Sequence, residues 1–563
     1  MEKNKANISL RLLTLGDRAI AVEFGQAIEL DINQRIMALR DKIQQTIQQG
    51  KLAGIVEMVP TYCSLLVEYN PLLISYDELA QTLQQMAEHI EVLETASKEV
   101  VEIPVVYGGE YGPDLAEVAE YHQLSPQQVI DMHAEPEYPV YMLGFVAGFP
   151  YLGGMNPQLA TPRKASPRLK IEAGSVGIAG GQTGIYSVES PGGWQIIGRT
   201  NVKPYDVFRN PKILFRAGDK IKFRAVTKDE FALLEKQSVG EDSCGGECAK
   251  ERYVATSGIK ILSAGAGTFI ETSGVRGLQK DGFNCGGAMD ECAMILANII
   301  AGNIPKAAVL ESTLLGPEVE FNGECDFCIT GADQNATLDG TPVALYTKVH
   351  AKAGSILALS AAVSGLRTYI AFAGGIIAPS VNKNFGGIKI KSGDCFATGN
   401  FFAPKEISVR SIPAVFAKCS ARAGVVDIHV VKGAQFASFE GDSARSFLNA
   451  VYTVMPASNR MGCRLDGEHI QCRGGTDIIS DAIPWGSVQI TSAGLPIVML
   501  SDRQTTGGYA KIATVIPSDL HLFAQFVPGT KIRFVLVSRK HALSLLKKTN
   551  RLLLKKYSEV HYV

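Results

Sequence analysis

The sequence lacks any marked excess of charge, because 55 basic residues face 56 acidic ones and the formal net charge is −1. A broad charged face for nucleic acid or for a membrane surface is therefore not expected. Long hydrophobic runs are also missing: no segment has 18 apolar residues without polar interruption, and the N-terminus carries no apolar signal core. We therefore expect a cytoplasmic protein with neither nucleic acid nor membrane as a partner.

The sequence offers little support for disulfides or for a metal site. Eleven cysteines are an odd number, which favours reduced thiols in a chain without a secretory signal. Cys325 and Cys328 form a C-x-x-C, and Cys244 and Cys248 lie four apart, but no second ligand pair completes a zinc set. Buried or linker thiols account for these cysteines more simply, and we expect no metal.

Several catalytic motifs are missing as well. The chain has no G-x-x-x-x-G-K-[ST] phosphate loop and no G-x-S-x-G elbow, which argues against a P-loop nucleotide site and an esterase-type amidase. No Ala-Met-Lys-Met segment occurs, so any biotin would have to be carried by another chain. His133 and His350 have no metal-like or triad spacing, and we assign them no function.

The clearest positive feature is a glycine-rich stretch over residues 174–200. Glycine lets backbone N–H groups turn toward a ligand, so this stretch predicts a site built from loops. The pattern recurs near the C-terminus in the same order and at a nearly constant offset. Gly486-Ser487-Val488 repeats Gly174-Ser175-Val176, Gly507-Gly508 repeats Gly192-Gly193, and residues 529–534 repeat 218–223. Three ordered matches predict a duplicated β-rich domain.

The length of 563 residues requires several domains. Helical spacing from Asp31 to Gly50, a strand over 55–69 and a capping box at Ser75 predict an α+β domain at the N-terminus. A further capping box at Ser125, with Pro126 at the first helical position, predicts another helix. Short apolar runs between Gly and Pro predict β barrels or sandwiches further on, with one helix from Asp290, its expected N-cap, to Ala301. The expected segments are an α+β domain over 1–98, a barrel over 99–235, a linker over 236–257 and barrels over 258–404 and 405–563.

The first half resembles the allophanate hydrolase subunit 1 family. The motifs are Gly144–Leu152, Pro167-Arg168, Gly174-Ser175-Val176, Gly181–Tyr186 and Pro191–Trp194. The second half is similar to the subunit 2 family through Gly287–Asp290, Ser458–Leu465 and Gln504–Tyr509. Together the two resemblances cover nearly the whole chain, and the motifs are long enough to be specific.

The resemblance implies a fusion of the two small subunits of a bacterial ATP-dependent 5-oxoprolinase. The fold it implies is mainly β, with an α+β N-terminal domain and tandem cyclophilin-like β barrels. ATP with Mg would be the cofactor, and a separate catalytic subunit and a small-molecule amide would be the partners. Two alternatives stay open. One is biotin-dependent carboxyl transfer to a urea-like amide, with biotin on a separate carrier, and the other is inhibition of a histidine kinase.

ATP-dependent opening of a cyclic amide needs groups that stabilise charge more than it needs a nucleophile. The candidate catalytic residues are Arg168, Arg460 and Arg464. The candidate substrate or nucleotide ligands are Gly174, Ser175, Gln182, Tyr186, Gly192, Gly193, Trp194, Arg199, Asn459, Gln504, Thr505, Thr506, Gly507 and Gly508. Backbone N–H groups of Gly180 and Gly181 could add donors. The plainer reading is that the glycine pairs are hairpin turns, the aromatics core residues and the arginines surface ion pairs.

The middle domain departs from the family pattern twice. Glu271–Val275 stands where the family usually has Q-D-x-G-R, and Pro379–Asn384 stands where it usually has G-S-R-S-T. We therefore expect the site between the first and the last barrel, with the two glycine loops facing each other across one pocket.

Overall fold

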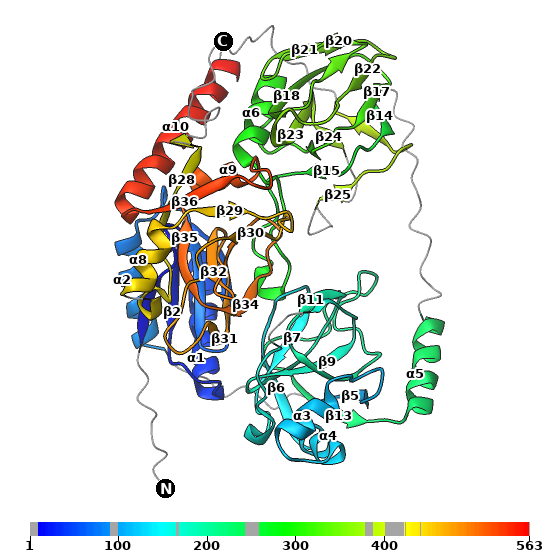
Figure 1. Ribbon diagram of the computed structural model, residues 1–563, viewed down its shortest axis with the longest axis vertical. Helices are drawn as coiled ribbons and strands as arrows, with labels where there is room; N and C mark the ends of the chain where they lie inside the picture. Colours follow the sequence, from blue (N-terminus) through cyan, green and yellow to red (C-terminus); the bar gives the residue numbers. More distant parts are fainter. Residues whose placement is uncertain are drawn as a thin grey trace.

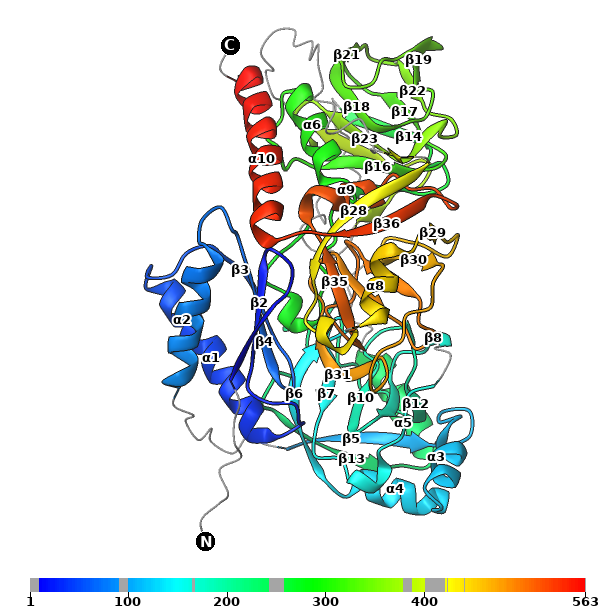
Figure 2. The same cartoon turned by 60° about the vertical axis from the view of Figure 1, so that its left-hand side comes forward.

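The structure, a computed structural model, describes residues 10–90, 100–164, 168–241, 258–377, 387–399, 421–422, 424–439 and 441–561. In Figure 1 the last barrel occupies the centre, with the middle domain above it and the first barrel below it. The N-terminal domain lies beside the last barrel, as the turned view in Figure 2 shows. None of the described helices is both long and apolar enough to pass through a membrane.

The N-terminal domain combines two helices with a four-stranded antiparallel sheet of order β1-β2-β4-β3. The elements are β1 (Arg11–Thr14), β2 (Ala19–Glu23), α1 (Leu30–Gln48), β3 (Ile55–Pro60), β4 (Ser64–Tyr69) and α2 (Tyr76–Glu88). The apolar residues of α1 are buried at the expected helical spacing, and Ser75 caps α2 by accepting from Glu78 N. The single strand expected over 55–69 is wrong: the chain turns after Pro60, where Thr61 N donates to Ser64 O, and forms a hairpin.

Seven strands close the first barrel in the ring order β5-β13-β6-β7-β10-β9-β12. They are β5 (Val100–Tyr107), β6 (Glu137–Gly144), β7 (Phe149–Leu152), β9 (Ser175–Ala179), β10 (Gln182–Ile185), β12 (Gln195–Arg199) and β13 (Lys220–Ala225). A two-stranded ribbon, β8 (Arg168–Ile171) with β11 (Ser190–Gly192), and helices α3 (Leu115–Tyr121) and α4 (Pro126–Ala134) complete the domain. The expected capping box at Ser125 is present.

The last barrel repeats this ring strand for strand, in the order β28-β36-β29-β30-β33-β32-β35. Its strands are β28 (Val425–Lys432), β29 (Tyr452–Val454), β30 (Gly462–Asp466), β32 (Ser487–Ile490), β33 (Pro496–Met499), β35 (Lys511–Val515) and β36 (Lys531–Leu536). The ribbon has its counterpart too, in β31 (Asp477–Ala482) and β34 (Thr506–Tyr509).

The register of the one parallel strand pair in each ring establishes the duplication at residue level. Phe223 lies opposite Ile103 in the first barrel, and Phe534 lies opposite Ile428 in the last. All four side chains are buried in the core of their own barrel. The repeat expected from the glycine motifs is therefore confirmed, and the chain is mainly β with tandem barrels.

The middle domain differs from the other two. Its strands form a seven-stranded and a six-stranded sheet instead of one ring, and β14 (Gly258–Ser263) pairs antiparallel with β26 (Cys395–Thr398), where the barrels have a parallel pair. The strands that matter below are β15 (Thr268–Glu271), β16 (Val309–Thr313) and β18 (Cys325–Asp333). Helix α6 (Glu291–Ala301) follows the prediction, because the Asp290 side chain accepts from Ala293 N and Gly302 ends the helix in the left-handed conformation.

Some helices were not expected. Helix α5 (Lys228–Glu241) runs into the segment predicted as a linker from Lys236, and the remainder of that segment, with Cys244 and Cys248, lies outside the described residues. In the second half, α8 (Asp442–Asn449), α9 (Pro517–Phe523) and α10 (Arg539–His561) also form, and α10 packs beside α6 (Figure 1). The altered segment Pro379–Asn384 is outside the described residues as well.

Candidate active site between the two barrel copies

A cavity of about 220 Å³ lies between the first and the last barrel. Gly192, Gly193 and Trp194 line it from the first barrel, and Gly507, Gly508 and Tyr509 line it from the last. The structure thus brings both glycine loops, more than 300 residues apart in sequence, to one cavity, as the repeat led us to expect.

One wall of the cavity is aromatic. Phe149, Tyr186 and Trp194 contact one another edge to face, with ring centroids 5.2 to 6.4 Å apart. Phe145 and Tyr151 extend this wall toward the last barrel. Burial raises the pKa of the Tyr151 and Tyr186 phenols, so both hydroxyls stay protonated near neutral pH and can donate hydrogen bonds.

Strand β34 joins the aromatic wall to the last barrel. The buried Thr506 hydroxyl accepts from Phe145 N at 2.7 Å and donates to Tyr151 Oη at 3.2 Å. Phe145 has φ of +62°, an unusual backbone conformation for a bulky residue. Strain of this kind persists only where neighbouring contacts enforce it, and Thr506 supplies such a contact here.

Arg163 spans the cavity from the first barrel to the last. Its Nη1 donates to Gly508 O at 2.9 Å and its Nη2 to Ser480 Oγ at 3.3 Å, while Asp477 lies 3.6 Å away as an ion-pair partner. A Cβ at position 508 would fall 1.9 Å from Arg163 Nη1. Glycine at this position leaves room for the guanidinium, which would have to move aside for any larger residue.

The charge of the lining is one-sided. Arg163 and Arg464 line the cavity, and no Asp or Glu is among the described residues that do. Arg464 is exposed, and no ion pair of it with Asp466 or any other carboxylate is found in the described part of the chain. The amides of Asn459, Gln489 and Gln504 add neutral donors and acceptors. This set suits a small anionic ligand that also carries amide-like groups.

Nine predicted site residues line the cavity: Tyr186, Gly192, Gly193, Trp194, Asn459, Arg464, Gln504, Gly507 and Gly508. The other predicted residues do not. Gln182 sits one layer behind, where its Oε1 accepts from Ser480 Oγ at 3.0 Å, and Thr506 acts through Phe145 and Tyr151. Ser175 and Thr505 are buried away from the cavity, and Gly174 is packed against Thr200 O.

Two of the predicted arginines pair with carboxylates outside the cavity. Arg168 Nη2 lies 2.6 Å from Asp114 Oδ1, and Arg199 forms an ion pair with Glu172. Gly180 N donates to Thr161 O, so that this N–H is not free for a ligand. For Arg168, Arg199 and Gly180, a structural role explains the observed contacts better than ligand binding does.

Arg460 is partly buried in a cluster of charges between the middle domain and the last barrel. Its Nε lies 2.7 Å from Asp502 Oδ2, its Nη2 donates to Gly287 O at 2.7 Å and lies 3.0 Å from Glu271, and its Nη1 pairs with Glu311. Every nitrogen of the guanidinium is therefore engaged. Arg460 links the middle domain to the last barrel, and it is not among the residues that line the cavity.

The altered segment 271–276 lies at this same junction. Glu271 is buried beside Arg460, and Arg276 lies over the Trp485 ring at 5.9 Å. Neither residue lines the cavity between the barrels. The change from the family pattern thus affects the junction of the domains and leaves the cavity wall intact.

The lining contains residues that the sequence did not single out. Phe145, Phe149 and Tyr151 lie within the Gly144–Leu152 motif, and Gln489 lies in the second copy of the repeat. The motifs therefore contained the signal needed to predict all four residues. Arg163 had a weaker signal. The chain has two Pro-Arg pairs, 162–163 and 167–168, and only the structure places the first at the cavity.

The histidines and cysteines that the sequence left unassigned have structural surroundings. His133 is buried in the first barrel between Tyr107 and Thr183, and burial lowers its pKa to about 3. Cys325 and Cys328 are free thiols on β18, and burial raises the pKa of both. Across the described ranges, no three His, Cys, Asp or Glu side chains are grouped to hold a metal ion.

Two family models match the chain. Residues 10–215 match the carboxyltransferase domain, subdomain C and D, and residues 281–536 match the carboxyltransferase domain, subdomain A and B. The crystal structure of TTHA0988 covers 92% of this chain and 99% of its own, with a TM-score of 0.75 and 28% sequence identity.

The curated relatives divide along the same line. The B subunit of 5-oxoprolinase from Bacillus subtilis (strain 168) is 42% identical over 40% of this chain and 96% of its own length. The C subunit of 5-oxoprolinase from Haemophilus influenzae is 32% identical over 52% of this chain and 94% of its own. The urea amidolyase of Saccharomyces cerevisiae is 29% identical over 51% of this chain but only 17% of that protein. This chain belongs to the carboxyltransferase-domain family and joins, in one polypeptide, one half similar to the B subunit of 5-oxoprolinase and one half similar to the C subunit.

Proposed function

We propose that this chain is the substrate-binding component of an ATP-dependent 5-oxoprolinase, which opens 5-oxoproline to glutamate together with a separate catalytic subunit. The observation that carries the proposal is the cavity between the barrels, with two arginines, three side-chain amides and no carboxylate in its described lining. Relatives of the two halves are named as the B and C subunits of that enzyme.

The substrate matches this lining group by group. 5-Oxoproline is a small ring that carries a carboxylate and a lactam, and a guanidinium pairs well with a carboxylate. Arg464 is better placed than Arg163 for this role, because Arg163 already shares its charge with Asp477. The amides of Asn459, Gln489 and Gln504 can satisfy the lactam, and the aromatic wall can cover the ring.

A lactam is an unactivated amide, so its opening by water needs the carbonyl oxygen to become a better acceptor of charge. Phosphorylation of that oxygen by ATP supplies this activation. The residues of this chain bind the lactam, orient it and stabilise negative charge on it, while the aromatic wall limits access of water.

ATP with Mg does not fit the cavity. At about 220 Å³ the cavity is smaller than the range of about 300–1,000 Å³ usual for drug-sized ligands. Mg²⁺ prefers carboxylate and phosphate oxygens, and the described lining has no carboxylate. We place the nucleotide on the separate catalytic subunit, so that the role of this chain is to present the substrate.

The alternatives make different demands on the same surface. A carboxyltransferase acting on a urea-like amide would depend on a biotinylated carrier protein. An inhibitor of a histidine kinase would use the N-terminal half and leave the cavity unused. Loss of kinase phosphotransfer that is indifferent to Arg464→Ala would support the latter.

The test is phosphate release by the full chain mixed with the catalytic subunit. We expect phosphate and glutamate in equal amounts, and only when ATP, 5-oxoproline and both proteins are present. Phosphate release that does not depend on 5-oxoproline, or turnover that requires a biotinylated carrier, would contradict the proposal.

A further inference from the structure

Each barrel copy is followed by a helix, and the two helices differ in charge. Helix α5 follows β13 in the first copy, and α10 follows β36, the equivalent strand, in the last. Residues 228–241 contain two basic and four acidic residues, whereas residues 539–561 contain seven lysines and arginines and one acid. The match to subdomain A and B ends at residue 536, before α10 begins. The barrel itself therefore does not require a basic helix at this place.

The basic residues of α10 form a stripe on its outer side. Lys540, Lys547 and Arg551 are seven and four residues apart, which places them on one face of the helix, and Lys548 lies beside them. All four side chains are exposed, and none has an ion-pair partner in the described part of the chain. The other side faces the protein, since Ala542 is buried and α10 packs against α6 and α9. The stripe extends over about 16 Å of helix.

A groove of about 430 Å³ lies between α10 and the loop that precedes α2. Figure 2 shows α10 above the N-terminal domain, along the outside of the molecule. The described lining of the groove is Leu72 from the loop and, from the helix, Lys547, Asn550, Arg551, Leu554 and Lys555. Leu72 is 39% and Leu554 57% exposed. The groove thus combines three cations with two accessible leucines, and its described lining contains no carboxylate.

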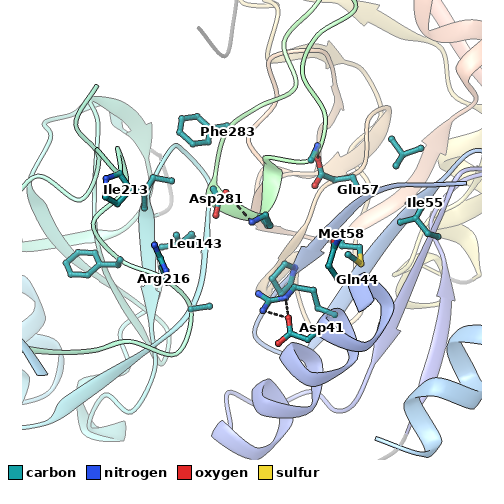
Figure 3. Close-up of a pocket in the computed structure, with 18 of the residues that line it drawn as sticks. Asp41, Gln44, Ile55, Glu57, Met58, Leu143, Ile213, Arg216, Asp281 and Phe283 are labelled. Atoms are coloured by element: carbon teal, nitrogen blue, oxygen red, sulfur yellow. Dashed lines mark hydrogen bonds and ion pairs between the residues drawn. The ribbon is translucent and has the colours of Figure 1, made fainter. Parts of the chain in front are cut away.

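A larger cleft elsewhere lacks this one-sided charge. It has a volume of about 900 Å³ and lies between the N-terminal domain, the first barrel and the short helix η3 (Gln279–Asp281), as Figure 3 shows. Its lining carries both signs, because Asp41 pairs with Arg40 and Asp281 lies 3.5 Å from Lys280. A surface with paired charges does not select a partner by charge, whereas a surface with cations alone does.

We propose that the groove beside α10 docks an acidic segment of the separate catalytic subunit, whose carboxylates pair with Lys547 and Arg551 and whose apolar side chain lies between Leu72 and Leu554. The identity of the partner rests on the proposed function. A free phosphate would have no use for the leucines. An anionic membrane would meet cations and leucines as well, but these leucines line a concave groove, and a groove receives a side chain of a protein better than it enters a bilayer.

Affinity for the catalytic subunit tests the charge contacts. In the double variant Lys547→Glu, Arg551→Glu, the Kd of the full chain for the purified subunit should rise by about tenfold or more, because carboxylates then face carboxylates. The Kd of the wild type should also rise with salt, and the double variant should lose this increase. The matched control is Lys352→Glu, Lys391→Glu, two exposed lysines of the middle domain, which should leave the Kd unchanged. Circular dichroism checks that both variants are folded.

Phosphate release separates docking from substrate binding. None of the residues that line the groove lines the cavity between the barrels. The Lys547→Glu, Arg551→Glu protein should therefore need about ten times more catalytic subunit for its half-maximal rate. Its KM for 5-oxoproline should equal that of the wild type once the subunit is saturating.

Three results would each overturn the proposal: an unchanged Kd in the double variant, an equal loss in the control, or no binding of the subunit at all. Vesicles of phosphatidylcholine and phosphatidylserine test the other class of partner. Binding of the full chain to these vesicles that the double variant abolishes, with the Kd for the subunit unchanged, would assign the groove to an anionic membrane surface instead.

The two proposals fail in different ways. If the subunit binds through the groove but phosphate release does not depend on 5-oxoproline, the proposed function is wrong and the docking surface stands. If turnover depends on 5-oxoproline and the double variant has the Kd of the wild type, the docking proposal is wrong and the function stands.

Discussion

Gly508 and Arg163 form a close contact between the two barrel copies inside the cavity. The guanidinium donates to Gly508 O, and the position of a Cβ on residue 508 lies 1.9 Å from Nη1. The substitution Gly508→Ala must therefore displace Arg163 from both Gly508 and Ser480.

We expect Gly508→Ala to raise the KM for 5-oxoproline by about tenfold, and to change the free energy of unfolding little because the flexible Arg163 side chain can move aside. Steady-state kinetics with the catalytic subunit and denaturant unfolding measure the two effects. Gly181→Ala is the matched control, since a Cβ there meets nothing within 4 Å and its φ is ordinary. If Gly508→Ala and Gly181→Ala had the same KM, the close contact between Gly508 and Arg163 would not contribute to substrate binding.

Glu271 lies in a buried cluster with more acids than bases. Arg460 and Arg367 supply two positive charges against the carboxylates of Glu271, Glu311 and Asp502, and one Glu271 oxygen has no hydrogen-bond donor in the described structure. Burial, with the Glu311 and Asp502 charges, raises the pKa of Glu271 to about 8 against the pull of Arg460. Glu271 is therefore the acid that holds a proton at neutral pH.

This shift predicts a pH-dependent stability. A carboxyl with a raised pKa in the folded state stabilises the fold fully below its unfolded pKa, near 4.5, and loses that contribution as pH rises through about 8. The Tm of the wild type should fall between pH 5 and pH 8.5 relative to that of Glu271→Gln, which cannot ionise. Thermal unfolding of both proteins across this range checks it, and a constant difference in Tm would contradict it.

Among the elements, strand β34 connects the two halves in part through the Thr506 hydroxyl. Thr506→Val removes the acceptor of Phe145 N and the donor to Tyr151, and leaves the N–H of a residue with positive φ without its partner. We expect a loss of about 1–3 kcal/mol in the free energy of unfolding. Thr506→Ser keeps the hydroxyl and should retain most of the stability. Urea unfolding compares the two, and an equal loss in both would assign the effect to packing of the methyl group.

The elements that could be predicted from sequence are those with a local signal. The periodicity of Ile32, Ile36, Leu39 and Ile43 and the cap at Ser125 describe helices that need no distant partner to be recognised. The β3-β4 hairpin was predicted as one strand, because its turn consists of ordinary residues held by Thr61 and Ser64. The polar end of helix α5, from Lys236, has the composition of a loop, and for this reason the sequence predicts a linker there.

The site residues that could be predicted from sequence were also those with a recognisable sequence pattern. Motifs repeated in both halves led to residues that line the cavity, since repetition reports a shared surface. Arg168 and Arg460 do not line the cavity, because carboxylates distant in sequence, Asp114, Glu311 and Asp502, engage them elsewhere. Whether an arginine binds a ligand or forms an ion pair depends on its neighbours in the folded protein, and a local sequence pattern does not show them.

At the scale of the whole molecule, the two halves form one unit through contacts that do not require a covalent link. Glu57 accepts from Gly277 N, Ser64 Oγ donates to Asp481 at 2.7 Å, and buried Arg503 lies 3.6 Å from Glu68. The relatives named as B and C subunits of 5-oxoprolinase each match one half of the chain.

We therefore predict that residues 1–241 and 258–563, co-expressed as two chains, copurify as a 1:1 complex in size-exclusion chromatography. The complex should support 5-oxoproline-dependent phosphate release with the catalytic subunit at a rate near that of the intact chain. Separate elution of two folded halves would show that the covalent link, and not the interface, holds the cavity together.

If the cavity between the barrel copies binds an anionic cyclic amide, Arg464 is the cation that should hold its carboxylate. The most direct measurement is the KM for 5-oxoproline of Arg464→Ala, in phosphate release with the catalytic subunit, beside Arg445→Ala on the exposed face of α8 as the control. We expect the KM to rise by about tenfold or more for Arg464→Ala, since a charge-assisted hydrogen bond contributes about 1.5–3 kcal/mol, and to stay unchanged for Arg445→Ala. An Arg464→Ala protein with the KM of the wild type would contradict it.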